Sequence, residues 1–107
     1  MARYMEMMFI DSSNNARLTG VGVEFQSDVD TTKAFEQARC HDVGKDAGTF
    51  ILDLCEENGD IVDSIAVSAD SFSEITGKQV LSEAEYIAYD ERYWRDEQAS
   101  MQLTENS

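Results

Sequence analysis

Cysteine and histidine are the side chains best suited to nucleophilic or metal chemistry, and this sequence has few of them. It contains two cysteines, Cys40 and Cys55, and one histidine, His41. A cysteine nucleophile needs an imidazole within hydrogen-bond reach, but neighbouring residues of a helix point about 100° apart. The three residues also lack the spacing of a four-ligand zinc site. We therefore expect no metal, two buried or half-buried free cysteines, and a surface histidine near a helix end.

Carboxylates are the other candidates for chemistry, and several occur in pairs: Glu56 with Glu57, Asp60 with Asp63, Asp90 with Glu91, and Asp96 with Glu97. General acid–base catalysis needs one carboxyl group with a raised pKa in an apolar pocket, whereas these pairs lie in polar runs. Residues 28–30 match only the start of a calcium loop, and residues 20–22 lack the third glycine of a phosphate-binding turn. The sequence therefore predicts a protein that is not an enzyme and has no cofactor.

Negative charge is the strongest feature of the composition. The 107 residues include 22 acidic and 8 basic side chains, for a formal charge of −14, and residues 49–107 carry −11 of it. Residues 46–77 contain no basic side chain. Nucleic acid and anionic membrane surfaces repel such a chain, so neither is expected as a direct partner. No apolar stretch approaches the roughly 20 residues of a membrane span, and the start lacks a secretion signal, which favours a cytoplasmic protein.

Alternating apolar residues predict two hairpins. Residues 3–10 have apolar side chains on both faces, which is typical of a central strand, and a turn at 11–15 leads to a second strand at 18–26. Residues 49–55 and 61–67 alternate again around Asn58-Gly59, the strongest hairpin signal in the chain and one that favours a type I′ turn.

Helix signals follow each hairpin. Capping candidates at Asp28, Asp30, Thr31 and Thr32 precede a helix that ends before Gly44, and residues 71–76 predict one helical turn closed by Gly77. The capping box of Ser82 and Glu85 predicts a longer helix to about Gln98, with Ala84, Ile87, Ala88 and Trp94 on one side and Tyr86, Tyr89 and Tyr93 on the adjoining flank. The expected domain covers residues 1–99, with a frayed tail at 100–107. The order ββαββα predicts an α+β fold in which helices pack on an antiparallel four-stranded sheet.

Two acidic segments stand out on these elements. In the last helix, Glu83, Asp90 and Glu97 recur at seven-residue steps, about 10 Å apart along one line. A basic groove that binds nucleic acid would attract such an array, and nearby aromatic side chains could anchor it. The candidate partner-binding residues are Glu56, Glu57, Asp60 and Asp63 in the hairpin, and Glu83, Tyr86, Asp90, Tyr93 and Glu97 in the helix.

In size and charge the chain resembles a class of small acidic inhibitors from phages and mobile elements, which includes DNA mimics, anti-restriction proteins and anti-CRISPRs. The class shares no motif or fold, so the resemblance implies only a role: blocking the basic, nucleic-acid-binding surface of a target protein in the host cytoplasm. Two alternatives stay open. In the first, the acidity serves only solubility, which the i,i+4 pairs Glu91–Arg95 and Arg92–Asp96 favour. In the second, the chain forms a homodimer through a sheet edge and the methionine-rich strand at residues 5–9.

Overall fold

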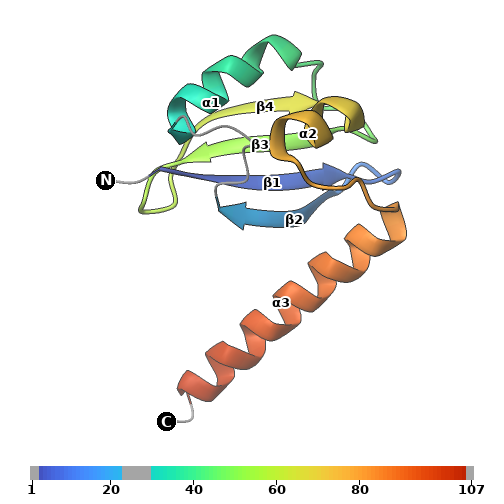
Figure 1. Cartoon of the computed structure of the whole chain (residues 1–107). Coiled ribbons are helices and arrows are strands. Elements are labelled where there is room, and N and C mark those ends of the chain that lie inside the picture. Colours follow the sequence, from blue (N-terminus) through green and yellow to red (C-terminus); the bar gives the residue numbers. More distant parts are fainter. Residues whose placement is uncertain (1–2, 23–29, 106–107) are drawn as a thin grey trace.

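A four-stranded antiparallel sheet with the order β2-β1-β3-β4 is the centre of the fold, and helices pack against it (Figure 1). The structure, a computed structural model, describes residues 3–22 and 30–105. The expected α+β class and antiparallel four-stranded sheet are confirmed. The elements are β1 (Tyr4–Ile10), β2 (Ala16–Gly22), α1 (Thr31–Ala38), the 3-10 turn η1 (Arg39–His41), β3 (Phe50–Cys55), β4 (Ile61–Val67), α2 (Ala69–Thr76) and α3 (Glu83–Glu105).

β1 is an inner strand, as its two apolar faces predict. It pairs with β2 on one side and β3 on the other. Met5 and Met7 are fully buried in a core that α1 and α2 cover. β1 has no free edge, and Met5 and Met7 are enclosed, so these two side chains cannot contact a second copy; the homodimer through a sheet edge stays a prediction.

The two hairpins share one turn geometry, which differs from the type I′ turn predicted at Asn58-Gly59. Glu56 N donates to Asp60 O and Gly59 N to Glu56 O, and residues 11–15 repeat both bonds. Only the last loop residue has positive φ, Gly59 at 97° and Asn14 at 68°. This pattern is a three-residue loop, a type I turn followed by a left-handed residue. The hairpin is confirmed, and the turn type is corrected.

Asn14 is therefore a position where glycine should stabilise the protein. The left-handed conformation costs an ordinary L-residue on the order of 1 kcal/mol, a cost that asparagine reduces and glycine avoids. We expect Asn14→Gly to raise the free energy of unfolding slightly and Asn14→Ala to lower it by about 1 kcal/mol, both measured by urea denaturation. Equal stabilities for the two variants would show that backbone conformation does not set the cost here.

Side-chain caps set most helix ends. Asp30 caps α1 by accepting from Lys33 N, while Asp28 lies outside the described residues. Ser68 begins α2, earlier than predicted, and Gly77 ends it with φ of 77°, as predicted. The capping box is confirmed, because Glu85 N donates to Ser82 Oγ at 3.3 Å and Ser82 N donates to Glu85 Oε1 at 3.2 Å.

α3 differs from its prediction in length and in the side that it buries. Its backbone is helical to Glu105, beyond the end predicted near Gln98, and residues 106 and 107 lie outside the described part. Ala84 and Ala88, which the sequence places on one apolar side of this helix, are exposed. The helix instead turns Tyr86 and Asp90 inward, lies against β2, and then runs away from the sheet (Figure 1).

Candidate partner-binding surface

Two of the four hairpin carboxylates are neutralised by arginines of the same chain. Glu56 accepts from Arg3 Nη2 at 2.9 Å. Asp63 accepts from Arg39, whose hydrogen bond lowers the pKa of the Asp63 carboxyl group. Arg39 also binds Glu36 at 3.0 Å, so it links α1 to the edge strand β4. Glu56 and Asp63 therefore belong to ion pairs within the chain while their side chains stay 38% and 36% exposed, and their role in partner binding stays a prediction.

The other two hairpin carboxylates, Glu57 and Asp60, lie at the exposed end of the β3–β4 hairpin. Within residues 3–22 and 30–105 neither forms an ion pair, although Asn58 Nδ2 donates to Asp60 Oδ2 at 3.1 Å. Beside them Ile61 is 60% exposed and Val62 is 44% exposed. We name these four residues, Glu57, Asp60, Ile61 and Val62, the tip surface. It combines two carboxylates that form no ion pair within the described residues with two apolar side chains that are exposed to water.

The acidic line predicted on α3 exists, but its first two members face the protein. Glu83 accepts hydrogen bonds from the backbone and hydroxyl of Ser12. Asp90, 7% exposed, accepts from Leu18 N at 3.0 Å and from Trp94 Nε1 at 3.0 Å. Residues seven apart share one helix face, and this face lies on β2 until the helix leaves the sheet. Glu83 and Asp90 therefore attach α3 to the fold, and their role in partner binding stays a prediction.

Arg17 completes that attachment. Its Nε donates to Asp11 Oδ2 at 2.9 Å and its Nη1 to Asp90 Oδ2 at 3.3 Å. Asp11 is 2% exposed and also accepts from Ser13 N and Asn15 N in the first hairpin loop. A single guanidinium thus ties the β1–β2 turn to α3.

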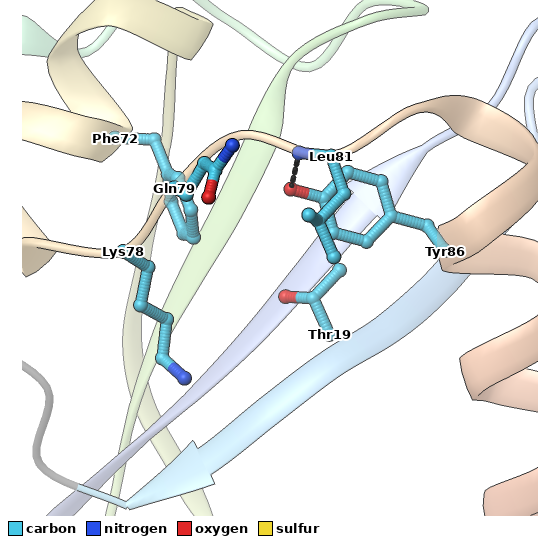
Figure 2. A pocket seen from close by; sticks show the side chains of 6 residues that line it. All are labelled: Thr19, Phe72, Lys78, Gln79, Leu81 and Tyr86. Carbon is cyan, nitrogen blue, oxygen red and sulfur yellow. Dashed lines mark hydrogen bonds between the residues drawn. The ribbon is translucent and has the colours of Figure 1, made fainter.

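Tyr86 is a core residue, not the surface contact that its position on the helix suggested. It is 4% exposed, and its ring centroid lies 5.0 Å from that of Phe9 and 5.6 Å from that of Phe50. Its hydroxyl accepts from Leu81 N at 2.9 Å, as Figure 2 shows, at the side of a hollow of about 220 Å³ beneath the segment between α2 and α3. The ring therefore holds that segment against the sheet.

Tyr93 and Glu97 remain accessible on the part of α3 that leaves the sheet. Glu97 is exposed, and Tyr93 is half-buried beside a hollow of about 220 Å³ that it forms with Tyr89, Arg92 and Asp96. Burial, Cys55, Glu6 and Tyr93 together raise the pKa of the Tyr4 hydroxyl, and a side chain at Gly59 would lie 3.8 Å from that hydroxyl. Tyr4 therefore lies between the hairpin loop and Tyr93, at one end of the molecule.

A polar row in the sheet escaped the sequence analysis. Glu6, Asp53 and Ser64 are successive cross-strand partners on β1, β3 and β4. They occupy the face opposite the one that α1 and α2 cover, because Met5, Leu52 and Leu54 point into the core. Burial and the neighbouring Asp53 raise the pKa of Glu6. Glu6 and Asp53 are the single charged residues of β1 and β3 and were visible in the sequence, but their alignment depends on the register between the two strands.

Glu6→Gln should stabilise the protein at neutral pH. Like charges directly opposite each other in a sheet are unfavourable by about half a kcal/mol when partly exposed. Because the folded-state pKa of Glu6 is raised, this penalty is present above that pKa and is relieved as the pH falls through it. We expect the melting temperature of Glu6→Gln to exceed that of the wild type at pH 7, with the gap closing near about pH 4.

The loss of stability at acid pH arises from other carboxyl groups, and this loss serves as the control for the Glu6→Gln prediction. Asp11 has its pKa lowered by hydrogen bonds from Asn15 N and Arg17, and Asp42 by bonds from Ala66 N and Gly44 N. Lowered carboxyl pKa values give stability that is lost as the pH falls, so both proteins should weaken in acid. A gap between wild type and Glu6→Gln that stays constant with pH would contradict the role of the Glu6 charge.

The two cysteines and the histidine lie in different surroundings. Cys55 is buried, and burial is the main cause that raises the pKa of its thiol. Cys40 is exposed, which corrects its predicted burial, and its Sγ donates to Gln37 O at 3.3 Å. His41 Nδ1 lies 3.5 Å from Ser71 Oγ. In the described part of the chain no group of three or more His, Cys, Asp or Glu residues is placed to hold a metal ion.

No family model, curated protein or solved structure matches the chain. Among residues 3–22 and 30–105, no helix has both the length and the apolar character needed to cross a bilayer.

Proposed function

We propose that this protein is a non-enzymatic binding protein that docks its tip surface on a basic, nucleic-acid-binding surface of a target protein and thereby blocks it. The observation that carries the proposal is the tip surface itself, where two carboxylates that form no ion pair within the described residues lie beside two exposed aliphatic side chains. Charge steers a cationic partner to such a surface. The exposed apolar side chains lose their water when a partner covers them and so supply affinity that charge alone lacks.

Some of the predicted partner-binding residues also make contacts within the chain. Five of the nine residues expected at the interface also make contacts within the chain: Glu56 and Asp63 in ion pairs, Glu83 and Asp90 of α3 with the β1–β2 hairpin, and Tyr86 in the core. Glu57 and Asp60, with Tyr93 and Glu97 on α3, are the residues that remain for a partner. A small docking surface of this kind fits an inhibitor that occupies one basic groove.

Charge reversal at the tip surface tests the proposal. We expect Glu57→Lys/Asp60→Lys to weaken binding to a basic target captured from host lysate by on the order of a hundredfold, because like-charge contacts at an interface cost several kcal/mol and each ~1.4 kcal/mol is tenfold. Asp46→Lys/Glu74→Lys is the matched control, since it makes the same change in net charge at two exposed positions outside the tip surface. Capture should also weaken as salt rises.

Equal loss of capture in the two double variants would show that net charge, and not the tip surface, drives association. That result favours the alternative in which acidity serves solubility only.

A further inference from the structure

The hollow beneath the segment that joins α2 to α3 shares no residue with the tip surface. Its volume is about 220 Å³, and side chains from β2, α2, the joining segment and α3 line it: Thr19, Phe72, Lys78, Gln79, Leu81 and Tyr86 (Figure 2). An engineered cavity of about 150 Å³ in another protein is large enough to bind benzene. The hollow therefore has room for one aromatic ring and a small polar group.

Two aromatic rings form the apolar part of this hollow. Phe72 is 1% exposed and Tyr86 is 4% exposed, whereas Leu81 is 42% exposed. The hollow is thus walled by buried rings and reaches solvent beside Leu81. Buried rings favour contact with a further ring in an offset or edge-to-face arrangement.

The Tyr86 hydroxyl has a proton to donate. Its oxygen accepts from Leu81 N at 2.9 Å, but in the part of the chain that the structure describes its own proton meets no acceptor. Buried tyrosine hydroxyls usually find such a partner. Thr19 uses its proton on Met7 O at 3.0 Å, so it supplies no donor. An occupant of the hollow that carries an acceptor oxygen would pair with Tyr86.

Lys78 brings positive charge to the same hollow. A Cβ atom on Gly20 would lie 3.7 Å from Lys78 Nζ and 2.9 Å from Met7 Cε. A glycine inside a strand often marks a place where another group packs closely, and here it leaves space for the lysine across β2. An ammonium group has three donors, so it can hold an anion together with another contact.

We propose that this hollow binds a small monocarboxylate whose apolar body is about the size of one aromatic ring. The ring packs against Phe72 and Tyr86, and the carboxylate accepts from the Tyr86 hydroxyl and the Lys78 ammonium. A neutral ring would leave the charge of Lys78 unmatched, and a cation would be repelled by it. The inference does not depend on the proposed function.

The test is an NMR titration of the full chain with benzoate, with benzyl alcohol and acetate as comparisons. We expect the amide resonance of Leu81 and the phenolic carbon resonance of Tyr86 to shift saturably with benzoate. Benzyl alcohol lacks the charge and acetate lacks the ring, so each should bind about tenfold more weakly than benzoate.

Substitution of Lys78 tests the charge. Lys78→Gln should weaken benzoate binding by about tenfold and leave benzyl alcohol binding unchanged, a difference that general damage to the hollow would not produce. Lys45→Gln is the matched control, because it removes the same charge at an exposed position outside the hollow. Lys78→Arg keeps the charge and should retain benzoate binding.

Three results would overturn the inference. Equal binding of benzoate and benzyl alcohol would exclude a carboxylate as the preferred group. Equal weakening by Lys78→Gln and Lys45→Gln would show that net charge, and not the hollow, attracts the anion. Lack of a saturable shift at Leu81 and Tyr86 would show that the hollow holds only water. The proposed function would stand in each case, because target capture is measured at other residues.

Discussion

Arg17→Ala is expected to lower the free energy of unfolding by about 3 kcal/mol, a cost typical of breaking a buried ion pair by removing one partner. The guanidinium lies between the side chains of Asp11 and Asp90, which are 3% and 11% exposed. Without it, two nearly buried carboxylates lose their shared counter-charge, and the link between the β1–β2 hairpin and α3 is lost. Urea denaturation at neutral pH measures the loss.

Trp94 offers a second measurement of the same change. It is the only tryptophan of the chain, and its Nε1 donates to Asp90 Oδ1 at 3.0 Å. Detachment of α3 from β2 should therefore alter its fluorescence before the sheet unfolds. Arg95→Ala is the matched control, an exposed arginine on the same helix that should change stability by less than about 0.5 kcal/mol. An Arg17→Ala variant as stable as Arg95→Ala would show that the ion pairs contribute nothing net.

Phe50→Ala should have the larger effect, a loss of about 3–5 kcal/mol. Phe50 is fully buried, and its ring stacks on that of Phe72 with centroids 4.1 Å apart. Phe9 lies 5.1 Å away on the adjoining strand. Truncation removes the shared ring of this aromatic cluster and leaves a cavity between β3 and α2 that the fixed helix cannot fill.

Small domains have total stabilities near this loss, so Phe50→Leu provides a milder version that should stay folded. We expect Phe50→Leu to lose part of the stability lost by Phe50→Ala, both read from urea denaturation curves. A loss below about 1 kcal/mol for Phe50→Ala would mean that the aromatic cluster is not the centre of the core.

Local patterns were sufficient to predict most of the fold. Alternation placed β1 at the centre, and the Ser82–Glu85 box and Gly77 marked helix ends where they occur. The errors arise where two local conformations have similar energies, so that tertiary contacts decide which one forms. Asn58-Gly59 suits a type I′ turn, but the bond from Glu56 N to Asp60 O selects a longer loop in which Gly59 alone has positive φ.

The candidate site was harder to predict for the same reason. Charge counting identified the acidic segments but could not show which carboxylates meet an arginine, because Arg3 and Arg39 are remote in sequence from Glu56 and Asp63. The face of α3 that lies on the sheet was also misjudged, since an inward Asp90 is favourable only when Leu18 N and Arg17 are there to meet it. The opposition of Glu6 and Asp53 follows from strand register, which no local pattern encodes.

Competition with nucleic acid is the most direct test of the proposed function. The protein is immobilised, and release of its captured target is measured as duplex DNA is added at constant salt. DNA bound to the target is followed in parallel. If the protein occupies the nucleic-acid-binding surface, DNA should displace it in proportion to DNA occupancy of the target, and Glu57→Lys/Asp60→Lys should be displaced at lower DNA concentration. A complex in which the target holds DNA and this protein together, with neither weakening the other, would contradict the proposal.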